Sequence, residues 1–343
     1  MGKGSALMRK VNWGILSTAD IARKLTIPAM LRAKNAELVA IASHSASGSA
    51  SVQAKKFNIP KAYHSFEELL GEPSIDAVYI PLPNHLHAEW VKKAAEMGKH
   101  VLCEKPAALT VEDTKEMIEV CEKNGVLFME TFMYQYHPQN KRVRDIIATG
   151  EIGDVKLVRS HCSFFLENKD GNFRLTTETG GGSLYDVGVY CIHTIRNVLK
   201  LEPTRVYAKA INDKENPVDI STTGVMEFEN GVKGVFDCSM DMAQHMSYEV
   251  VGTKGIIQVP RAYRPDLYNG EGIVQVISND GDVRKEIIQG DEYKLAIEHI
   301  SECILDQEKP RYDSMNTIHN MNALDACFAS IKSGTEVEVR KVD

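Results

Sequence analysis

The sequence predicts two domains: a doubly wound parallel α/β domain, then an α+β domain with an open-faced, predominantly antiparallel sheet and flanking helices. Three observations support this prediction. Short apolar runs alternate with segments of helical periodicity up to residue 130. From residue 155 to 259, strand-like runs follow one another directly, and Glu229-Asn230-Gly231 is a typical hairpin turn between two of them. The chain then returns to helical periodicity, and 343 residues are enough for two domains.

Each element of the first domain has a local signature. Residues 20–33 place Ile21, Leu25 and Ala29 on one stripe of a helix. Gly98 is suited to end a helix, and Thr110 is suited to begin one because two acidic residues follow it closely. The predicted strands are residues 11–16, 36–42, 75–81, 100–103 and 126–130, and the predicted helices are residues 20–33, 49–57, 86–97 and 110–124. Helices that connect successive strands indicate a parallel sheet covered on both faces.

The second domain has a different order of strands and helices. Its predicted strands are residues 155–165, 205–209, 222–228, 233–240, 246–252 and 255–259, and its predicted helices are residues 293–306 and 316–333. We place the junction near residues 131–138, which gives domains of residues 10–133 and 134–343. The C-terminal helices are expected to pack back towards the first domain.

Composition excludes several classes of protein. A net charge of −7 and a pI of about 5.9 argue against a nucleic-acid partner. No apolar run approaches the ~18 residues of a membrane span, and residues 1–10 lack the apolar core of a secretory signal. The seven cysteines are an odd number without a CxxC pair, which fits reduced thiols better than disulfides or a zinc site. We therefore expect a cytoplasmic protein with no bound metal and no membrane contact.

The turn after the first strand is a candidate dinucleotide site. The three small positions of the fingerprint G-x-G-x-x-G/A fall on Ser17, Ala19 and Ala22, and none of them is glycine. Small side chains still allow the backbone to approach a pyrophosphate, and a helix that begins near Asp20 offers its amide groups to phosphates. An ordinary strand–helix turn is the alternative. The candidate cofactor-binding residues here are Ser17, Thr18, Ala19, Asp20 and Ile21.

Two further strand ends belong to the predicted cofactor site. Ser43-His44-Ser45 stands where an NAD-binding site usually carries an acid, so NADP is the expected cofactor and NAD remains an option. An exposed loop histidine is the alternative for His44. The loop Pro81-Leu82-Pro83-Asn84 is stiffened by two prolines. Asn84 could instead cap the next helix, and His87 could either face the cofactor or satisfy local hydrogen bonds.

The catalytic candidates lie far apart in the chain. Glu104-Lys105-Pro106 directly follows an apolar strand, at the sheet edge where open α/β sheets bind ligands. A later glycine-rich stretch brings Asp186 and Tyr190, which share one face if the segment is helical. The alternatives are a solvated lysine, a capping carboxylate and a core tyrosine.

We expect these three side chains to move a proton while a cofactor moves a hydride. The ammonium of Lys105 would favour the phenolate of Tyr190 and lower its pKa, and either residue could carry the proton. Lys105 could also stabilise charge that develops on the substrate oxygen. Asp186 would position Lys105 or contact a substrate hydroxyl.

Together these motifs resemble the glucose–fructose oxidoreductase/inositol dehydrogenase-like (Gfo/Idh/MocA) oxidoreductases over nearly the whole chain. The resemblance is carried by the first turn, the Pro-x-Pro-Asn-His loop, Glu104-Lys105-Pro106, Met133-Tyr134-x-Tyr136-His137-Pro138 and the Gly-Gly-Gly-x-Leu-x-Asp-x-Gly-x-Tyr element. It implies a Rossmann domain, an open-faced sheet domain, and a homodimer or homotetramer that buries one face of that sheet. The Ser-Thr-Ala turn and Tyr190 are most similar to the branch with dihydrodiol dehydrogenase and NADP-dependent xylose dehydrogenase.

The resemblance also implies a substrate pocket. Its expected lining is Tyr134, Tyr136, His137, Asp186, Tyr190 and His193. Core packing is the alternative for the first three and for His193. Inositol is a less expected substrate, because inositol dehydrogenases typically have histidine where this chain has Tyr190. Gln135 stands where the family often has arginine, so a substrate contact is expected to differ there. Glu104 is placed beside the cofactor, where it would orient the backbone or pair with a base.

We therefore predict an NAD(P)-dependent oxidoreductase that transfers a hydride between nicotinamide and a sugar, polyol or related alcohol or carbonyl substrate. A catalytically silent dinucleotide-binding regulator on the same fold is the alternative. The presence of Lys105, Asp186 and Tyr190 favours the enzyme, because a silent relative has no chemical need for them. A carbohydrate-binding module without cofactor fits the first turn poorly.

Overall fold

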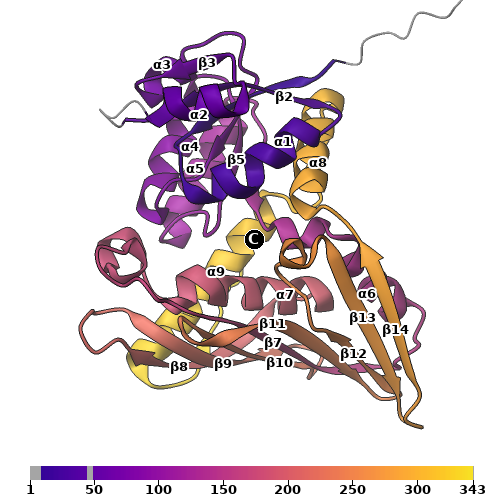
Figure 1. Ribbon diagram of the computed structural model, residues 1–343. Helices are drawn as coiled ribbons and strands as arrows, with labels where there is room; N and C mark the ends of the chain where they lie inside the picture. Colours follow the sequence, from indigo (N-terminus) through magenta and orange to yellow (C-terminus); the bar gives the residue numbers. More distant parts are fainter. Residues whose placement is uncertain (1–8, 45–48, 343) are drawn as a thin grey trace, which may run out of the picture.

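The computed structural model describes residues 9–44 and 49–342. Its N-terminal part is built on a six-stranded sheet of order β3-β2-β1-β4-β5-β6, in which every neighbouring pair is parallel (Figure 1). The strands are β1 (Val11–Leu16), β2 (Ala36–Ala42), β3 (Lys61–Tyr63), β4 (Ala77–Ile80), β5 (His100–Glu104) and β6 (Phe128–Thr131). The order switches direction between β1 and β4, and open α/β sheets bind ligands beyond the carboxyl ends of the strands at such a point.

Helices cover both faces of this sheet, as the sequence predicts. They are the π-helical turn η1 (Ala22–Thr26) with α1 (Ile27–Arg32), then α2 (Ser49–Phe57), α3 (Phe66–Leu70), η2 (Asn84–Leu86) with α4 (His87–Glu96), and α5 (Val111–Lys123). Ile15 and Tyr79 belong to a core with α1 and α2, whereas Val78 and Ile80 belong to a core with α4 and α5. Thr110 begins α5 as expected, because its hydroxyl accepts a hydrogen bond of 3.0 Å from the amide of Asp113.

The second part of the chain forms a nine-stranded sheet of order β14-β13-β12-β11-β7-β10-β9-β8-β15. All neighbouring pairs are antiparallel except β7 and β10. The strands are β7 (Val155–Phe165), β8 (Pro203–Asn212), β9 (Asp219–Phe228), β10 (Lys233–Ser239), β11 (Asp241–Gly252), β12 (Gly255–Val259), β13 (Glu271–Ser278), β14 (Val283–Gln289) and β15 (Val337–Glu338). Strands β13, β14 and β15 are not among the elements predicted from the sequence.

Apart from α8 (Glu292–Asp306), which packs against β1 and β2 of the first sheet, the α-helices of the second part lie on one face of the nine-stranded sheet, and the other face is open (Figure 1). The α-helices are α6 (Pro138–Ala148), α7 (Val189–Leu199), α8 (Glu292–Asp306) and α9 (Ser314–Ser333), and the short turns are η3 (Met133–Tyr136), η4 (Phe173–Leu175), η5 (Thr177–Thr179), η6 (Leu184–Gly188) and η7 (Pro265–Tyr268). Helix α6 is not among the predicted elements. Apolar side chains such as Ile287 (58% exposed) remain uncovered on the open face.

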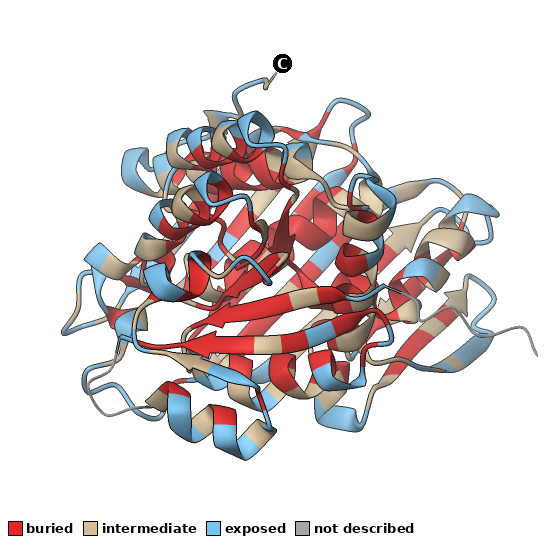
Figure 2. Ribbon diagram, turned by 90° about the horizontal axis from the view of Figure 1, so that it is seen from above, coloured by how far each residue is buried: buried red, intermediate tan, exposed pale blue. Residues whose placement is uncertain are grey.

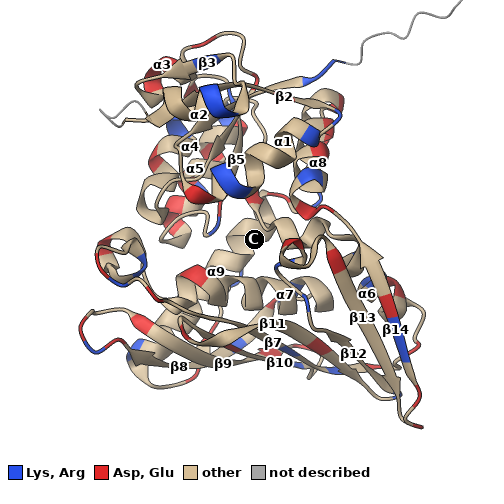
Figure 3. Cartoon of the chain, in the orientation of Figure 1, with Lys and Arg blue, Asp and Glu red and all other residues tan. Residues whose placement is uncertain are grey.

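The two sheets form one molecule because the C-terminal helices join them. The indole nitrogen of Trp13 in β1 donates a hydrogen bond of 3.1 Å to the hydroxyl of Ser301 in α8, and both residues are fully buried. Buried residues therefore run through the strands and the inner helix faces of both parts (Figure 2). Charged residues of both signs are spread over both parts (Figure 3). Within the described ranges, no helix combines the length and apolarity needed to cross a bilayer.

Candidate active site

A cleft of about 710 Å³ lies where the carboxyl ends of β1, β4 and β5 face the second sheet domain. This volume falls in the range that small-molecule sites occupy. The predicted site residues that line it are Ser17, Ala19, Asp20, Ile21, Pro81, Leu82, Asn84, Glu104, Lys105, Asp186 and Tyr190. The fold thus brings four separate chain segments together at the strand-order switch.

The turn after β1 has the backbone that a phosphate-binding turn needs. Ser17 has a φ of +130°, in the left-handed half of conformational space that favours glycine. Its hydroxyl accepts a 3.0 Å hydrogen bond from the amide of Ala19, which stabilises this conformation. The next amides open the helix and have no partner within it. Thr18 does not line the cleft, because its hydroxyl lies 3.3 Å from that of Ser49 at the start of α2.

Ser43 and His44 lie beside the cleft rather than in its wall. The hydroxyl of Ser43 accepts a 3.1 Å hydrogen bond from the amide of Ala50 and therefore holds the start of α2. The ring of His44 packs edge-on against Phe66 with centroids 4.2 Å apart, and the side chain is half exposed. This corresponds to the alternative of an exposed loop histidine. Ser45, the third residue of the motif, lies outside the described residues.

Asn84 in the loop after β4 and His87 at the start of α4 are both held by hydrogen bonds, and for His87 this is the alternative of local hydrogen bonds that the sequence left open. The amide of Asn84 donates a 2.9 Å hydrogen bond to the carbonyl of Gly180, so it ties the cofactor loop to the glycine-rich element and does not cap a helix. His87 is fully buried, and its ring nitrogens lie 2.8 Å from the carbonyl oxygens of Pro106 and Leu82. Burial lowers the pKa of His87 to about 4. His87 thus makes local hydrogen bonds and does not line the cleft.

Glu104 lines the cleft floor and is held by the sheet. Its carboxyl group accepts a 2.6 Å hydrogen bond from the hydroxyl of Tyr79 on β4. Burial raises the pKa of Glu104, although the hydrogen bond from Tyr79 and the charge of Lys105 oppose this rise. The side chain therefore braces β5 against β4 directly before Lys105.

Lys105 and Asp186 meet across the cleft. The ammonium donates a 2.6 Å hydrogen bond to the main-chain oxygen of Asp186 and lies 3.3 Å from its carboxylate Oδ1. Burial would raise the pKa of Asp186, but the charges and hydrogen bonds of Lys105 and Arg174 outweigh it and lower the pKa to about 2. Asp186 is therefore ionised at neutral pH and keeps the ammonium in place.

Tyr190 stands beside this pair. Its ring centroid lies 5.0 Å from the nitrogen of Lys105, and its hydroxyl forms no hydrogen bond with any described residue. The expectation of a lowered pKa is wrong for this state of the site. Burial raises the pKa of Tyr190 well above its usual value, and Glu104 adds to the rise, while Arg264 opposes it. The phenol is therefore protonated at neutral pH and is poised as a proton donor.

Four predicted substrate contacts lie in the core instead of the cleft. The ring of His193 stacks on Phe132 at 3.7 Å, and its Nδ1 lies 2.8 Å from the hydroxyl of Tyr134. Tyr136 donates to the sulfur of Met129, and His137 contacts the carbonyl of Gly270. Their burial corresponds to the alternative of core packing that the sequence left open, and their polar atoms form hydrogen bonds, except that Nε2 of His193 is buried without a partner among the described residues. Gln135 belongs to the same network, since its side chain donates to Tyr134.

The second domain contributes a wall of the cleft that the sequence motifs do not predict. The missed lining residues are Cys162, Phe164, Phe173, Arg174, Val187, Gln244, Met246, Tyr263, Arg264, Leu267 and Tyr293, with Pro83 from the first domain. Arg264 is fixed by two hydrogen bonds to Asp266, of 2.7 and 2.8 Å. Apart from Val187 in the glycine-rich element and Pro83 in the proline loop, these residues lie in strands, loops and a helix without a recognisable motif, so only the tertiary structure places them together.

A parallel sheet with a cleft at its strand-order switch, and a lysine–carboxylate–tyrosine group in that cleft, are typical of dinucleotide-dependent oxidoreductases. Comparison with known proteins agrees. Residues 11–132 match the oxidoreductase family with an NAD-binding Rossmann fold, and residues 140–258 match the Gfo/Idh/MocA C-terminal domain. The chain belongs to the Gfo/Idh/MocA oxidoreductase family.

Individual relatives cover most of the chain. D-xylose 1-dehydrogenase (NADP(+)) 2 of Haloferax volcanii is 37% identical over 95% of this chain and 99% of its own length. Trans-1,2-dihydrobenzene-1,2-diol dehydrogenase of Mus musculus is 31% identical over 76% of this chain and 78% of its own. A 3-ketoreductase from Actinomadura kijaniata, solved with NADP and TDP-benzene, is similar with a TM-score of 0.88 at 27% identity, covering 94% of this chain and 98% of its own.

These findings confirm the predicted family, fold class and enzyme class. The protein is an NAD(P)-dependent dehydrogenase or reductase, and nothing in the comparisons favours a silent regulator. The cleft fits such a cofactor, because Ser17 and Ala19 present small side chains in the turn at the carboxyl end of β1. The loop from Pro81 to Asn84 would hold its other side.

Proposed function

We propose that this protein transfers a hydride between NADP and the secondary alcohol or carbonyl group of a sugar or related polyol. The observation that carries the proposal is the meeting of Lys105, Asp186 and Tyr190 in a cleft that also contains the first turn of the dinucleotide fold. When bound, the nicotinamide cofactor accepts or supplies the hydride.

The side chains of the cleft divide the remaining work. In reduction, the hydroxyl of Tyr190 donates a proton to the substrate oxygen, since burial keeps the phenol protonated. Lys105 stabilises negative charge that develops on that oxygen, and in oxidation it stabilises the phenolate that must accept the proton. Asp186 is the ionised carboxylate that holds Lys105 through its side chain and its main chain.

The relatives support the substrate class and the cofactor. The Haloferax relative is named as an NADP-dependent xylose dehydrogenase, and the Actinomadura ketoreductase was solved with NADP. The cleft of this chain combines charged and hydroxyl-bearing side chains with the rings of Phe173 and Tyr263. Such a mixture suits a polyhydroxylated ring, which presents both polar edges and an apolar face.

Self-association through the open face of the second sheet is part of the proposal, as a homodimer or homotetramer. No helix covers this face in the described residues, and Tyr207 and Ile287 are exposed on it, at 44% and 58%. A double change of Tyr207 and Ile287 to glutamate should yield monomers in analytical ultracentrifugation. A monomeric unmodified protein would refute the assembly without affecting the proposed chemistry.

A cytoplasmic location is part of the proposal as well. It rests on the seven cysteines, whose odd number and lack of a CxxC pair fit reduced thiols.

A substrate screen tests the reaction itself. Purified protein is supplied with NADP and a panel of aldoses, inositols, sugar nucleotides and dihydrodiols, and reduced nicotinamide is followed by absorbance. We expect turnover with aldoses or related sugars and none with inositols. The reverse reaction uses NADPH with keto sugars. Absence of turnover across both panels, despite measurable NADPH binding, would contradict the proposed function.

A further inference from the structure

Arg174 reaches the centre of the cleft from a segment in which the sequence analysis recognises no motif. It lies in η4, and its Nε donates a 2.7 Å hydrogen bond to Oδ2 of Asp186. The other carboxylate oxygen, Oδ1, faces the ammonium of Lys105 at 3.3 Å. One carboxylate is therefore shared between two cations, which leaves the group of three with a net charge of +1.

The main chain of Arg174 is tied to the same element as its side chain. Its carbonyl oxygen accepts a 2.9 Å hydrogen bond from the amide of Gly182, and its amide donates 3.1 Å to the side chain of Asn172. A Cβ atom at Gly181 would lie only 2.5 Å from this carbonyl oxygen, so glycine is needed for the close approach. The loop thus rests directly against the stretch that leads into Asp186.

Partial burial makes the ion pair between Arg174 and Asp186 stronger than an ion pair on the surface. The side chains of Lys105 and Asp186 are each 13% exposed, and that of Arg174 is 32% exposed. Water and salt screen such a partly buried pair less than an exposed one. Without the guanidinium, Asp186 would have a single charged partner, and both carboxylate oxygens would become free to turn towards Lys105.

We propose that Arg174 is a positioning residue: it fixes the Asp186 carboxylate, and through it the Lys105 ammonium, in the arrangement that proton transfer at Tyr190 requires. The proposal rests on the proposed function of the cleft. Arg174 opposes a collapse of Lys105 onto Asp186 and so keeps the ammonium near the ring of Tyr190, where it now lies at 5.0 Å. The charge and the hydrogen bond of Arg174 that fix the Asp186 carboxylate also help to lower the pKa of that carboxylate.

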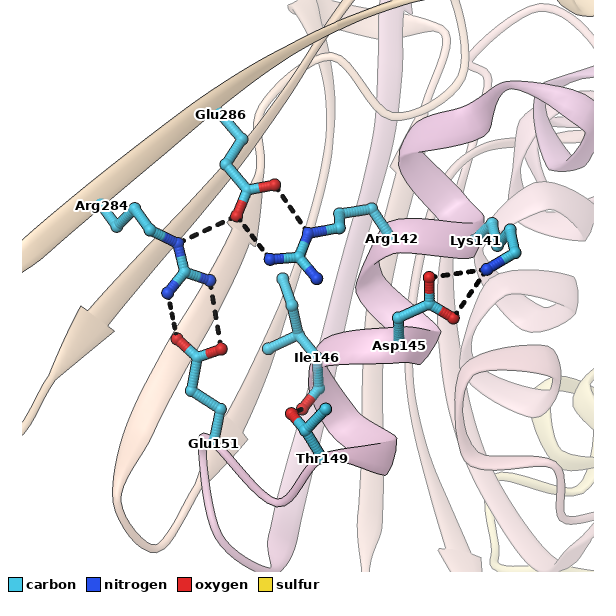
Figure 4. A network of polar contacts seen from close by, with 8 residues as sticks. All are labelled: Lys141, Arg142, Asp145, Ile146, Thr149, Glu151, Arg284 and Glu286. Atoms are coloured by element: carbon cyan, nitrogen blue, oxygen red, sulfur yellow. Dashed lines mark hydrogen bonds and ion pairs between the residues drawn. The ribbon is translucent and has the colours of Figure 1, made fainter.

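A matched control exists elsewhere in the chain. Arg142 in α6 donates from its Nε to Oε2 of Glu286 at 2.7 Å, the same atom and distance as in the Arg174 pair. This pair belongs to a network with Arg284 and Glu151 that joins α6 to β14 (Figure 4), and none of these residues lines the cleft. Arg142→Gln therefore removes an arginine–carboxylate pair with a matching Nε hydrogen bond from residues that do not line the cleft.

The experiment compares Arg174→Gln, Arg174→Lys and Arg142→Gln. We expect Arg174→Gln to lower kcat about tenfold to a hundredfold with a smaller change in KM, because misplacement of a catalytic group affects the chemical step. The acid limb of its pH profile should move to higher pH, since Asp186 loses a charge partner. Arg174→Lys should restore part of kcat, and Arg142→Gln should retain the original kcat and pH profile.

Two measurements distinguish a positioning role of Arg174 from a general loss of stability and from a failure of the proposed function. Thermal unfolding should show similar losses for Arg174→Gln and Arg142→Gln. A crystal structure of Arg174→Gln should show the carboxylate of Asp186 rotated and the nitrogen of Lys105 farther from the ring of Tyr190, whether or not a substrate is known. An unchanged Lys105–Asp186 geometry, or an unchanged kcat and pH profile, would overturn the proposal. A changed geometry in an enzyme without any sugar turnover would refute only the proposed function.

Discussion

Lys105 donates its shorter hydrogen bond to the main-chain oxygen of Asp186, at 2.6 Å, rather than to the carboxylate at 3.3 Å. A carbonyl oxygen carries no net charge, so this bond orients the ammonium without neutralising it. Lys105 is therefore held in place and still able to stabilise a negative oxygen in the cleft. The strand–turn that carries Lys105 in the first domain meets the glycine-rich turn of the second domain at this pair of residues.

Replacement of Lys105 by methionine should abolish turnover. The change removes the positive charge at the substrate oxygen and the group that favours the phenolate of Tyr190. NADPH binding should persist, since the first turn is untouched, and a titration of nicotinamide fluorescence measures it. Lys92→Met, which removes an ion pair with Glu116 on the surface, is the control and should leave the rate unchanged. Normal turnover in Lys105→Met would exclude this lysine from the mechanism.

Replacement of Tyr190 by phenylalanine should lower kcat by about 10²- to 10⁴-fold, the usual contribution of a positioned acid or base. KM should change much less, because the ring still packs in the cleft wall. Burial raises the pKa of the Tyr190 phenol, so reduction by the unmodified enzyme should keep its rate through neutral and mildly alkaline pH. A rate of reduction that falls steeply as the pH rises through neutrality would contradict Tyr190 as the proton donor.

Glu130 should make stability depend on pH. This residue of β6 is 4% exposed, accepts a 2.9 Å hydrogen bond from the amide of Ala107, and has a pKa raised by burial from 4.5 to about 7. The folded protein therefore binds this proton more tightly than the unfolded chain does. The resulting stabilisation is fully present below about pH 4.5 and is lost as the pH rises through 7, on the order of 3 kcal/mol in total.

Glu130→Gln removes this titration and keeps an oxygen for the amide of Ala107. The stability of the variant minus that of the unmodified protein should be larger near pH 8 than near pH 5. Thermal unfolding of both proteins at the two pH values measures this difference. An equal difference in Tm at both values would mean that Glu130 does not titrate in this range.

NADPH should bind at least about tenfold more tightly than NADH, which corresponds to about 1.4 kcal/mol. Fluorescence titration with both cofactors measures the ratio. His44→Ala should reduce the ratio only if the histidine leaves its packing against Phe66 to meet the 2′-phosphate. Equal or reversed affinities in the unmodified protein would defeat the preference for NADP, while an unchanged ratio in His44→Ala would place the discrimination elsewhere.

Local patterns were sufficient for the elements with clear boundaries. In α5, a capping threonine precedes a regular apolar stripe, and in β1 the small residues of the first turn follow an apolar run. Helix α6 was missed because polar residues dominate it and only Val143 and Ile146 form its deeply buried apolar face. Strand β14 was missed because it is an edge strand whose charged residues pair with α6, so apolar residues do not define its inner face.

The sequence by itself determined the order of most elements, although not α6 or β13 to β15. It also determined the first-domain turn and the identities of Lys105, Asp186 and Tyr190, because each lies in a local motif whose geometry depends on its neighbours in the chain. Only the tertiary structure decided which polar residues face the cleft. Tyr134, His137 and His193 lie in the core, whereas Arg174 and Arg264 reach the cleft from loops. Burial and charge pairing depend on contacts between segments that are distant in sequence. For the same reason the pKa of Tyr190 is raised by burial, although the neighbouring charge of Lys105 predicted a lower pKa.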